Sequence, residues 1–97
     1  MYGLFLSNRC KKSLKKLEHH KKFKKEIFDK VVGILLTGER LPKEYKEHKL
    51  SGDYVGCYEC HIQNDILLIY YFDDGKCILY GIDIGHIASF FRKKAAS

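Results

Sequence analysis

Three hydrophobic segments in the second half of the chain, separated by short turn sequences, constrain the fold more than any other feature. They span residues 57–63, 66–72 and 76–82 and are rich in Ile, Leu, Tyr and Cys. The gaps, Asn64-Asp65 and Asp73-Asp74-Gly75, are typical of hairpin turns. The pattern predicts three consecutive antiparallel strands, and their apolar face needs a cover.

The first half of the chain provides that cover as two predicted helices. Residues 2–6 indicate a short strand, and Ser7 or Asn8 suits the N-cap of a helix over residues 9–22. A second helical pattern covers residues 24–37, and Gly38 suits the left-handed position after it. The predicted order is β-α-α-β-β-β, an α+β fold with two N-terminal helices packed on one antiparallel sheet.

The remaining segments are a long connection and the C-terminal end. Residues 39–56 are polar and predict a long ordered loop with a strand start inside it. Connections of this length in a small domain are more often functional than idle. Residues 84–91 predict a last short helix or turn, and residues 92–97 a frayed basic tail. With 97 residues and 45% hydrophobic content, we expect a single domain over residues 1–97.

The chain is basic, with a net charge of +6 and a pI near 9.1. This charge favours a polyanionic partner such as nucleic acid, the ribosome or an acidic protein, although a merely soluble basic surface has the same composition. Half of the eighteen basic residues fall in the first predicted helix and just beyond it: Arg9, Lys11, Lys12, Lys15, Lys16, Lys21, Lys22, Lys24 and Lys25. Such a run is usually a solvated face, but its density suggests contact with phosphates.

No signal peptide or transmembrane segment is visible in the sequence, so we expect a cytoplasmic protein. The apolar run at residues 4–6 is far shorter than the roughly 20 residues that a membrane span needs, so we expect no membrane partner. The four cysteines are then expected to be reduced.

The sequence Cys57-Tyr-Glu-Cys-His61 has the spacing of a c-type haem attachment motif. Because it lies in a predicted strand, Cys57 and Cys60 should point to opposite faces, which thioether attachment does not allow. The same argument disfavours a zinc site, which needs both thiolates on one turn. We therefore interpret Cys60 as a small core residue and expect no cofactor.

Three histidines and one aspartate carry the chemistry of the second half: His48, His61, Asp65 and His86. Histidine has an unperturbed pKa of about 6.5, so it can give or take a proton near neutral pH. On a lysine-rich protein, such groups are the minimum needed to cleave RNA without a metal. For His61 and Asp65 alone, an ordinary solvated position on an open sheet face is the alternative.

The phrases that contain these residues resemble the YafQ branch of the RelE/ParE toxin superfamily. The resemblance covers roughly residues 41–90 in motif detail, and it rests on the phrases Lys46-Glu-His48, Glu59-Cys-His-Ile62, Asp65-Ile-Leu-Leu-Ile-Tyr70 and the His86/Phe90 pair. It implies the compact RelE fold and a toxin of a type II toxin–antitoxin pair. Such toxins cleave mRNA in the ribosomal A site without a metal and are held inactive by an antitoxin that wraps them.

The resemblance also implies roles for individual residues. His48, His61, Asp65 and His86 match catalytic positions, with His86 as general acid and His48, or Asp65 working with His61, on the base side. Substrate contacts would come from the Phe90 ring, which a base can stack on, and from Lys46 and Lys49 as phosphate contacts.

Three positions depart from the family pattern. Arginine is common where this chain has Ile82 and Tyr58, and an aromatic residue where it has Ile66. Isoleucine cannot supply the charge of a phosphate-directed arginine, so a lysine or Arg92 replaces it, or activity is weak or absent. The alternatives are a toxin relative that acts by binding RNA, the ribosome or another target such as gyrase, and a plain basic RNA-binding domain.

Overall fold

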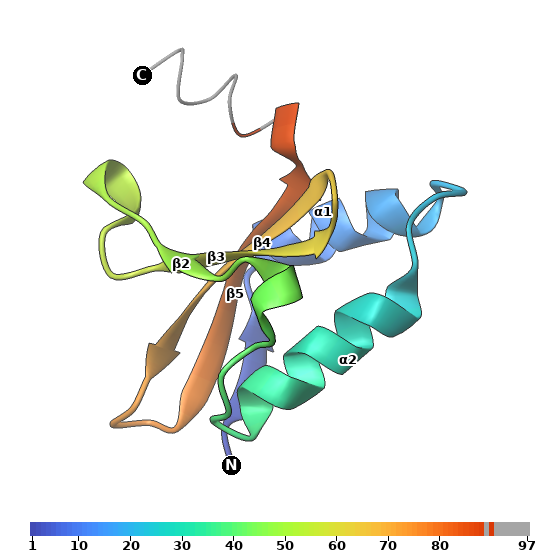
Figure 1. The fold of residues 1–97 in the computed structure, drawn as a ribbon. Coiled ribbons are helices and arrows are strands. Elements are labelled where there is room, and N and C mark those ends of the chain that lie inside the picture. The colour runs from blue at the N-terminus through green and yellow to red at the C-terminus, as the bar shows by residue number, and fades with distance from the viewer. Residues whose placement is uncertain (89, 91–97) are drawn as a thin grey trace.

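The computed structural model describes residues 1–88 and residue 90, and its element order confirms the predicted α+β fold (Figure 1). A two-residue strand and two short 3₁₀ turns lie in the long connection. The elements are β1 (Gly3–Leu6), α1 (Asn8–Glu18), α2 (Lys25–Leu36), η1 (Lys43–Tyr45), β2 (His48–Lys49), η2 (Gly52–Tyr54), β3 (Tyr58–Gln63), β4 (Ile66–Asp73) and β5 (Ile78–His86). Among the described residues, no helix is long and apolar enough to cross a bilayer.

The five strands form one sheet in the order β1-β5-β4-β3-β2. The sheet is mixed rather than wholly antiparallel, because β1 pairs in parallel with β5 while every other pair is antiparallel. The two helices carry the chain from β1 across one face to the far edge. The strands then return one by one, and the last of them arrives beside β1.

Helix α1 begins as predicted and ends earlier. The Ser7 hydroxyl caps it by accepting a hydrogen bond from the Cys10 amide at 3.0 Å. Its buried residues, Cys10, Leu14 and Leu17, pack on β5. The helix ends at Glu18 instead of residue 22, since no apolar side chain follows Leu17 until Phe23 to hold further turns against the sheet. At Gly81 of β5, an added Cβ atom would lie 2.6 Å from Leu6 Cδ2 of β1, so the Leu6 side chain would have to shift.

Helix α2 matches its prediction closely and covers the other part of the same face. It buries Phe28, Val31, Val32 and Leu35, and it ends before Gly38, whose φ of 82° is the left-handed conformation that glycine allows. The main core lies between the two helices and the sheet, where Cys60, Ile62, Ile66, Leu68 and Tyr70 meet the helical side chains.

Strand β5 is longer than predicted. It continues to His86, paired with β4, where a helix or turn over residues 84–91 was expected; of the described residues after it, Ile87, Ala88 and Phe90 are helical. The pairing with β4 skips Ile82, a local irregularity of the kind a β-bulge makes. The predicted tail, residues 92–97, lies outside the described residues.

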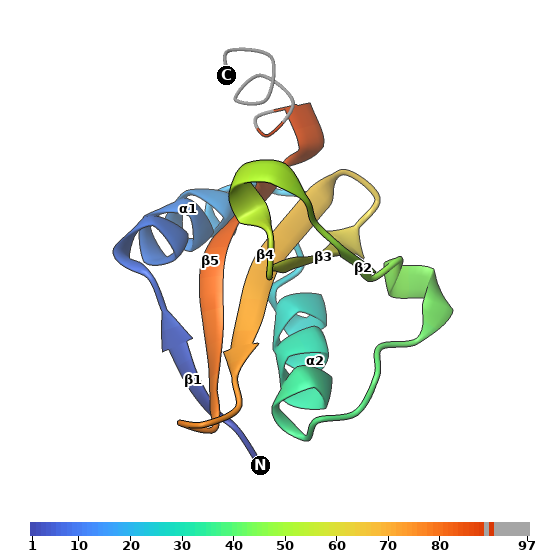
Figure 2. The same cartoon turned by 90° about the vertical axis from the view of Figure 1, so that its left-hand side faces the viewer.

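Neither α1 nor α2 lies over the other face of the sheet. A small second cluster lies there, made of Leu67, Ile69 and Phe90 with Leu50, Tyr54, Cys57, Ile82 and Ile87 packed around them. The loop that carries η2 stands over this face (Figure 1) and crosses in front of the upper parts of β4 and β5 (Figure 2). We call this side the open face.

Candidate active site

Strand β3 divides its side chains between the two faces as its sequence predicts. Cys60 and Ile62 are buried in the main core, whereas Cys57 packs with the cluster on the open face. Burial raises the pKa of the Cys60 thiol to about 12, so it stays protonated at neutral pH. The two sulfur atoms lie on opposite faces of the sheet, and the interpretation of Cys60 as a core residue is confirmed.

A cleft of about 630 Å³ opens on the open face beside β2 and β3. One wall is the polar segment from β2 to η2, and the floor is formed by β3, β4 and Phe90. The lining residues are His48, Lys49, Leu50, Ser51, Gly52, Asp53, Tyr54, Glu59, Ile69 and Phe90. Two of the predicted substrate contacts, Lys49 and Phe90, and one predicted catalytic residue, His48, therefore lie in one cleft.

His48 is held by partners at both ring nitrogens. Its Nδ1 lies 3.0 Å from the backbone oxygen of Lys46, and its Nε2 lies 3.2 Å from Oε1 of Glu59. In the neutral ring, Nδ1–H donates to the Lys46 carbonyl and Nε2 is left as the proton acceptor. Once Nε2 takes a proton, the imidazolium faces the carboxylate of Glu59, which is only 8% exposed.

Glu47 explains why His48 faces the cleft. The hydroxyl of the fully buried Tyr70 donates a hydrogen bond to the Glu47 carboxylate. Burial, with smaller contributions from Cys60 and Glu47, raises the pKa of Tyr70 above its usual value, so its hydroxyl keeps the proton that it donates. Because successive strand residues point to opposite faces, anchoring Glu47 on the helix side directs His48 to the open face. Lys46, in the left-handed conformation with a φ of 49°, ends the η1 turn two residues before this short strand.

Changing Tyr70 to phenylalanine tests this anchor. We expect the variant to lose about 1.5 kcal/mol of unfolding free energy, because it removes one hydrogen bond to a charged group that is partly exposed. Chemical denaturation of Tyr70→Phe, Glu47→Ala and the double variant measures the coupling between the two side chains. Effects that simply add in the double variant contradict the anchor, and Glu47→Gln, which keeps an acceptor, is the matched control.

A second histidine–carboxylate pair lies where β5 ends. His86 Nδ1 is 3.5 Å from Asp65 Oδ2, in the turn between β3 and β4, and the amide of Ile87 donates to the Asp65 backbone oxygen at 2.9 Å. The His20 ring, just beyond α1, lies 5.3 Å from the His86 ring between centroids. The carboxylate of Asp65 is thus placed beside His86 rather than used as the expected partner of His61. His86 itself is the last residue of a strand, with its side chain 38% exposed.

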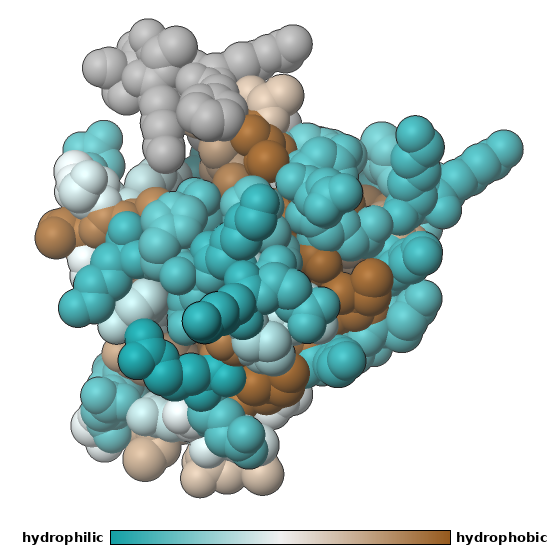
Figure 3. Space-filling view, in the orientation of Figure 1, coloured by the Kyte–Doolittle hydropathy of each residue, from teal (hydrophilic) through white to brown (hydrophobic). Residues whose placement is uncertain are grey.

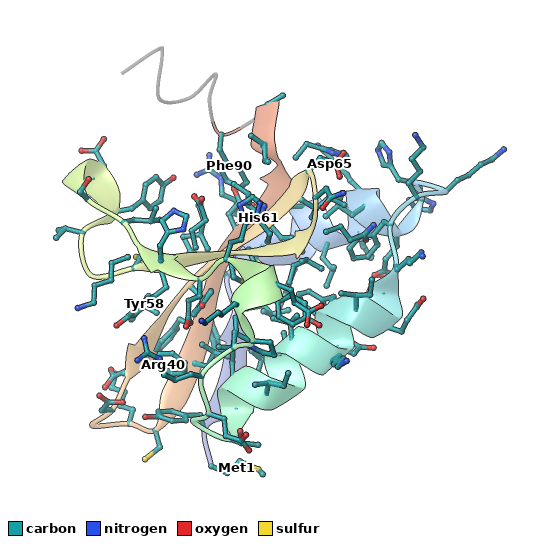
Figure 4. All side chains as sticks on the ribbon, viewed as in Figure 1. Met1, Arg40, Tyr58, His61, Asp65 and Phe90 are labelled. Atoms are coloured by element: carbon teal, nitrogen blue, oxygen red, sulfur yellow. The ribbon has the colours of Figure 1, made fainter. Side chains whose placement is uncertain are left out.

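The other predicted residues fall around these two pairs. His61 is half-buried and follows Glu59 on the open face, opposite Leu67 of β4. Figure 4 shows His61 and Phe90 close together in the view, with Asp65 further out at the tip of its turn. Phe90 is only 5% exposed, since it packs on Leu67 and Ile69, so little of its ring faces the cleft. Lys46 contributes its backbone oxygen to His48, but its side chain does not line the cleft.

Sequence reasoning missed two residues that the structure places at these pairs. Glu59 is the buried partner of His48. The sequence signal that could have pointed to Glu59 is the strand face it shares with His61 in the phrase Glu59-Cys-His. Its contact with His48 depends on the pairing of β2 with β3, which places His48 opposite Glu59. His20, just beyond α1, contacts the His86 ring.

Comparison with known proteins decides the family. The family model described as "Bacterial toxin of type II toxin-antitoxin system, YafQ" matches residues 2–92. The chain belongs to the YafQ family. The resemblance found in the sequence phrases is thereby confirmed, and so is the class of the protein as a toxin of a type II toxin–antitoxin system.

Individual relatives agree with the YafQ assignment. A protein of Haemophilus influenzae named as a YafQ toxin is 45% identical over 39 residues, 40% of this chain and 38% of that relative's length. A metal-bound toxin from Helicobacter pylori is 32% identical, with a TM-score of 0.86 over 94% of this chain and all of the other. YafQ of Escherichia coli in complex with DinJ shares the fold, with 23% identity and a TM-score of 0.82 over 94% of this chain and 99% of that one.

The Helicobacter pylori relative was solved with a bound metal. Among the described residues of this chain, no set of three or more His, Cys, Asp or Glu side chains is placed to hold a metal ion. Each of the two pairs above supplies one histidine and one carboxylate, so the described side chains do not form a site that fits a resident metal.

Proposed function

We propose that this YafQ-family toxin is an endoribonuclease that cleaves mRNA in the ribosomal A site and so inhibits translation. The observation that carries the proposal is the His48–Glu59 pair inside a cleft, together with a second histidine–carboxylate pair, His86–Asp65, where β5 ends. In this reaction the ribose 2′-hydroxyl attacks the neighbouring phosphorus, which yields a 2′,3′-cyclic phosphate and a free 5′-hydroxyl. A base must take the 2′ proton and an acid must protonate the leaving 5′ oxygen.

The His48–Glu59 pair suits the base side. The Lys46 carbonyl fixes the tautomer in which Nε2 accepts the proton. The carboxylate of Glu59, 3.2 Å away and nearly buried, then stabilises the imidazolium that forms. Two residues further along β3, His61 is a second polar group that the same substrate could contact.

The His86–Asp65 pair suits the acid side. With Nδ1 facing the Asp65 carboxylate at 3.5 Å, Nε2 is the ring nitrogen left to face the leaving oxygen. Asp65 is 70% exposed, so its proposed role is to orient the His86 ring.

The remaining contacts concern the substrate and the partner. Lys49 lines the cleft and supplies positive charge for the phosphate, and Phe90 forms an apolar wall. The Escherichia coli relative was solved with DinJ, and we propose that a cognate antitoxin protein likewise binds this chain and holds it inactive. The alternative, a toxin that acts by binding alone, is favoured by Ile82, which leaves the open face without the arginine of the family pattern.

Cleavage of ribosome-bound mRNA tests the proposal directly. Purified protein is added to ribosomes programmed with a defined mRNA, and the 5′ ends of the products are mapped by primer extension. We expect cuts in the A-site codon, no reaction on the same mRNA without ribosomes, and the same rate after chelation of divalent ions from the protein. In cells, expression of the chain alone should arrest growth. Growth at the normal rate with intact mRNA, at high expression of folded protein, supports the binding alternative.

A further inference from the structure

A second cleft, of about 430 Å³, lies on the other side of β5, against α1. It is lined by Arg9, Lys12, Ser13, Lys16 and Asp83. Lys12 and Ser13 lie three and four residues after Arg9, and four and three before Lys16, so the four helical residues share one face of α1. Three of them, Arg9, Lys12 and Lys16, belong to the basic run of the first predicted helix. From the sequence alone, that run could be either an ordinary solvated face or a phosphate-binding surface.

The buried carboxylate of Asp83 organises this cleft. Its Oδ1 accepts hydrogen bonds from the Ser13 hydroxyl and from the Ile84 amide, both at 2.8 Å, and its Oδ2 lies 3.9 Å from Nε of Arg9. Asp83 is 4% exposed and opposes the entry of an anion. Three cationic side chains against one carboxylate nevertheless leave a surplus of two positive charges in the lining.

The position of the cleft connects it to the proposed acid. Asp83 and His86 are three residues apart on β5, which corresponds to roughly 10 Å along a strand. His20 follows Lys16 by four residues, just past the end of α1, and its ring contacts His86. Hydrophilic side chains cover the end of α1 and the connection after it, at the upper right of Figure 3. A strand bound at His86 could therefore continue along α1.

We propose that the cleft between α1 and β5 binds the phosphate groups of RNA next to the site of cleavage. This inference rests on the proposed function, since it takes RNA as the ligand at His86. The lining is charged or polar throughout, which suits sequence-independent contact with the RNA backbone rather than with bases. The mRNA and ribosomal RNA both present these phosphodiester groups.

Binding of RNA that cannot be cleaved tests this inference apart from catalysis. A single-stranded 2′-O-methyl oligonucleotide lacks the attacking hydroxyl, so its affinity does not depend on any reaction. For the Lys12→Ala/Lys16→Ala double variant, we expect affinity to fall about 25-fold at 0.1 M salt. The slope of log affinity against log salt should fall by about 1.4, because each lost contact to single-stranded RNA removes about 0.7. The matched control is Lys30→Ala/Lys76→Ala, which removes the same charge from α2 and the β4–β5 turn, away from α1.

A second measurement with mRNA-free ribosomes separates the two sources of RNA. If Lys12→Ala/Lys16→Ala loses affinity for the oligonucleotide, the cleft is assigned to the substrate strand. If it loses affinity only for ribosomes, the cleft is assigned to ribosomal RNA. Equal losses of RNA affinity in Lys12→Ala/Lys16→Ala and in its control overturn the inference. Unchanged affinity of Lys12→Ala/Lys16→Ala for both the oligonucleotide and the ribosome also overturns it. So does unchanged RNA affinity combined with weaker binding of polyglutamate, which would assign the cleft to an acidic protein. Failure of the wild-type chain to bind RNA at all contradicts the proposed function itself.

Discussion

Replacing His86 with alanine is expected to slow RNA cleavage by a factor of about 10² to 10⁴, the usual contribution of a positioned acid or base. The protein should remain folded, because His86 is the last residue of β5, its side chain is partly exposed, and its partner Asp65 lies in an exposed turn. Single-turnover cleavage on programmed ribosomes measures the first effect, and thermal unfolding measures the second.

The matched control for His86→Ala is His19→Ala, an exposed histidine at the end of α1. It removes the same type of side chain nearby and should cleave at the wild-type rate. A wild-type rate in His86→Ala refutes its role as the acid. A large drop in melting temperature means that the contacts of His86 with Asp65 and His20 are mainly structural.

Replacing Ile82 with arginine is expected to raise the cleavage rate roughly tenfold to a hundredfold. A charged hydrogen bond to the transition state contributes about 1.5 to 3 kcal/mol. The opposing effect is burial, which the sequence left undecided between a core face and a functional face. The structure places Ile82 half-buried beside Leu67, Ile69 and Phe90 on the open face, the face that contains His48. There an arginine can extend its charged end to solvent or substrate.

Cleavage rate and melting temperature measured together on Ile82→Arg separate these effects. Ile82→Gln is the control, since it is polar and extended but carries no charge. Faster cleavage by the arginine variant alone, at nearly unchanged stability, means that the missing family charge limits this toxin. An arginine variant that is stable yet no faster means that another cation, such as Lys49, already provides the charge. Arg92, the other candidate in the sequence, lies outside the described residues.

Local features of the fold could be predicted because neighbouring residues determine them. Ser7 caps α1 by bonding an amide three residues away, and Gly38 adopts a left-handed backbone that other residues avoid. The alternation along β3 likewise needs only the pleat of a strand, so the opposite directions of Cys60 and His61 followed directly from their spacing. The candidate histidines were found in the same way, from their own phrases.

The partners of those histidines depended on tertiary structure. His48 meets Glu59 only because a two-residue strand, too short to show a pattern, pairs with β3 at one particular register. Asp65 meets His86 only because β5 continues four residues beyond its predicted end, to lie opposite the start of β4. The sequence by itself determined which side chains could transfer protons and that Cys60 and His61 point to opposite faces of one strand, since both depend on residue type and local period. Only the tertiary structure decided which carboxylate each histidine meets, because strand register is set by packing between residues that are distant in the chain.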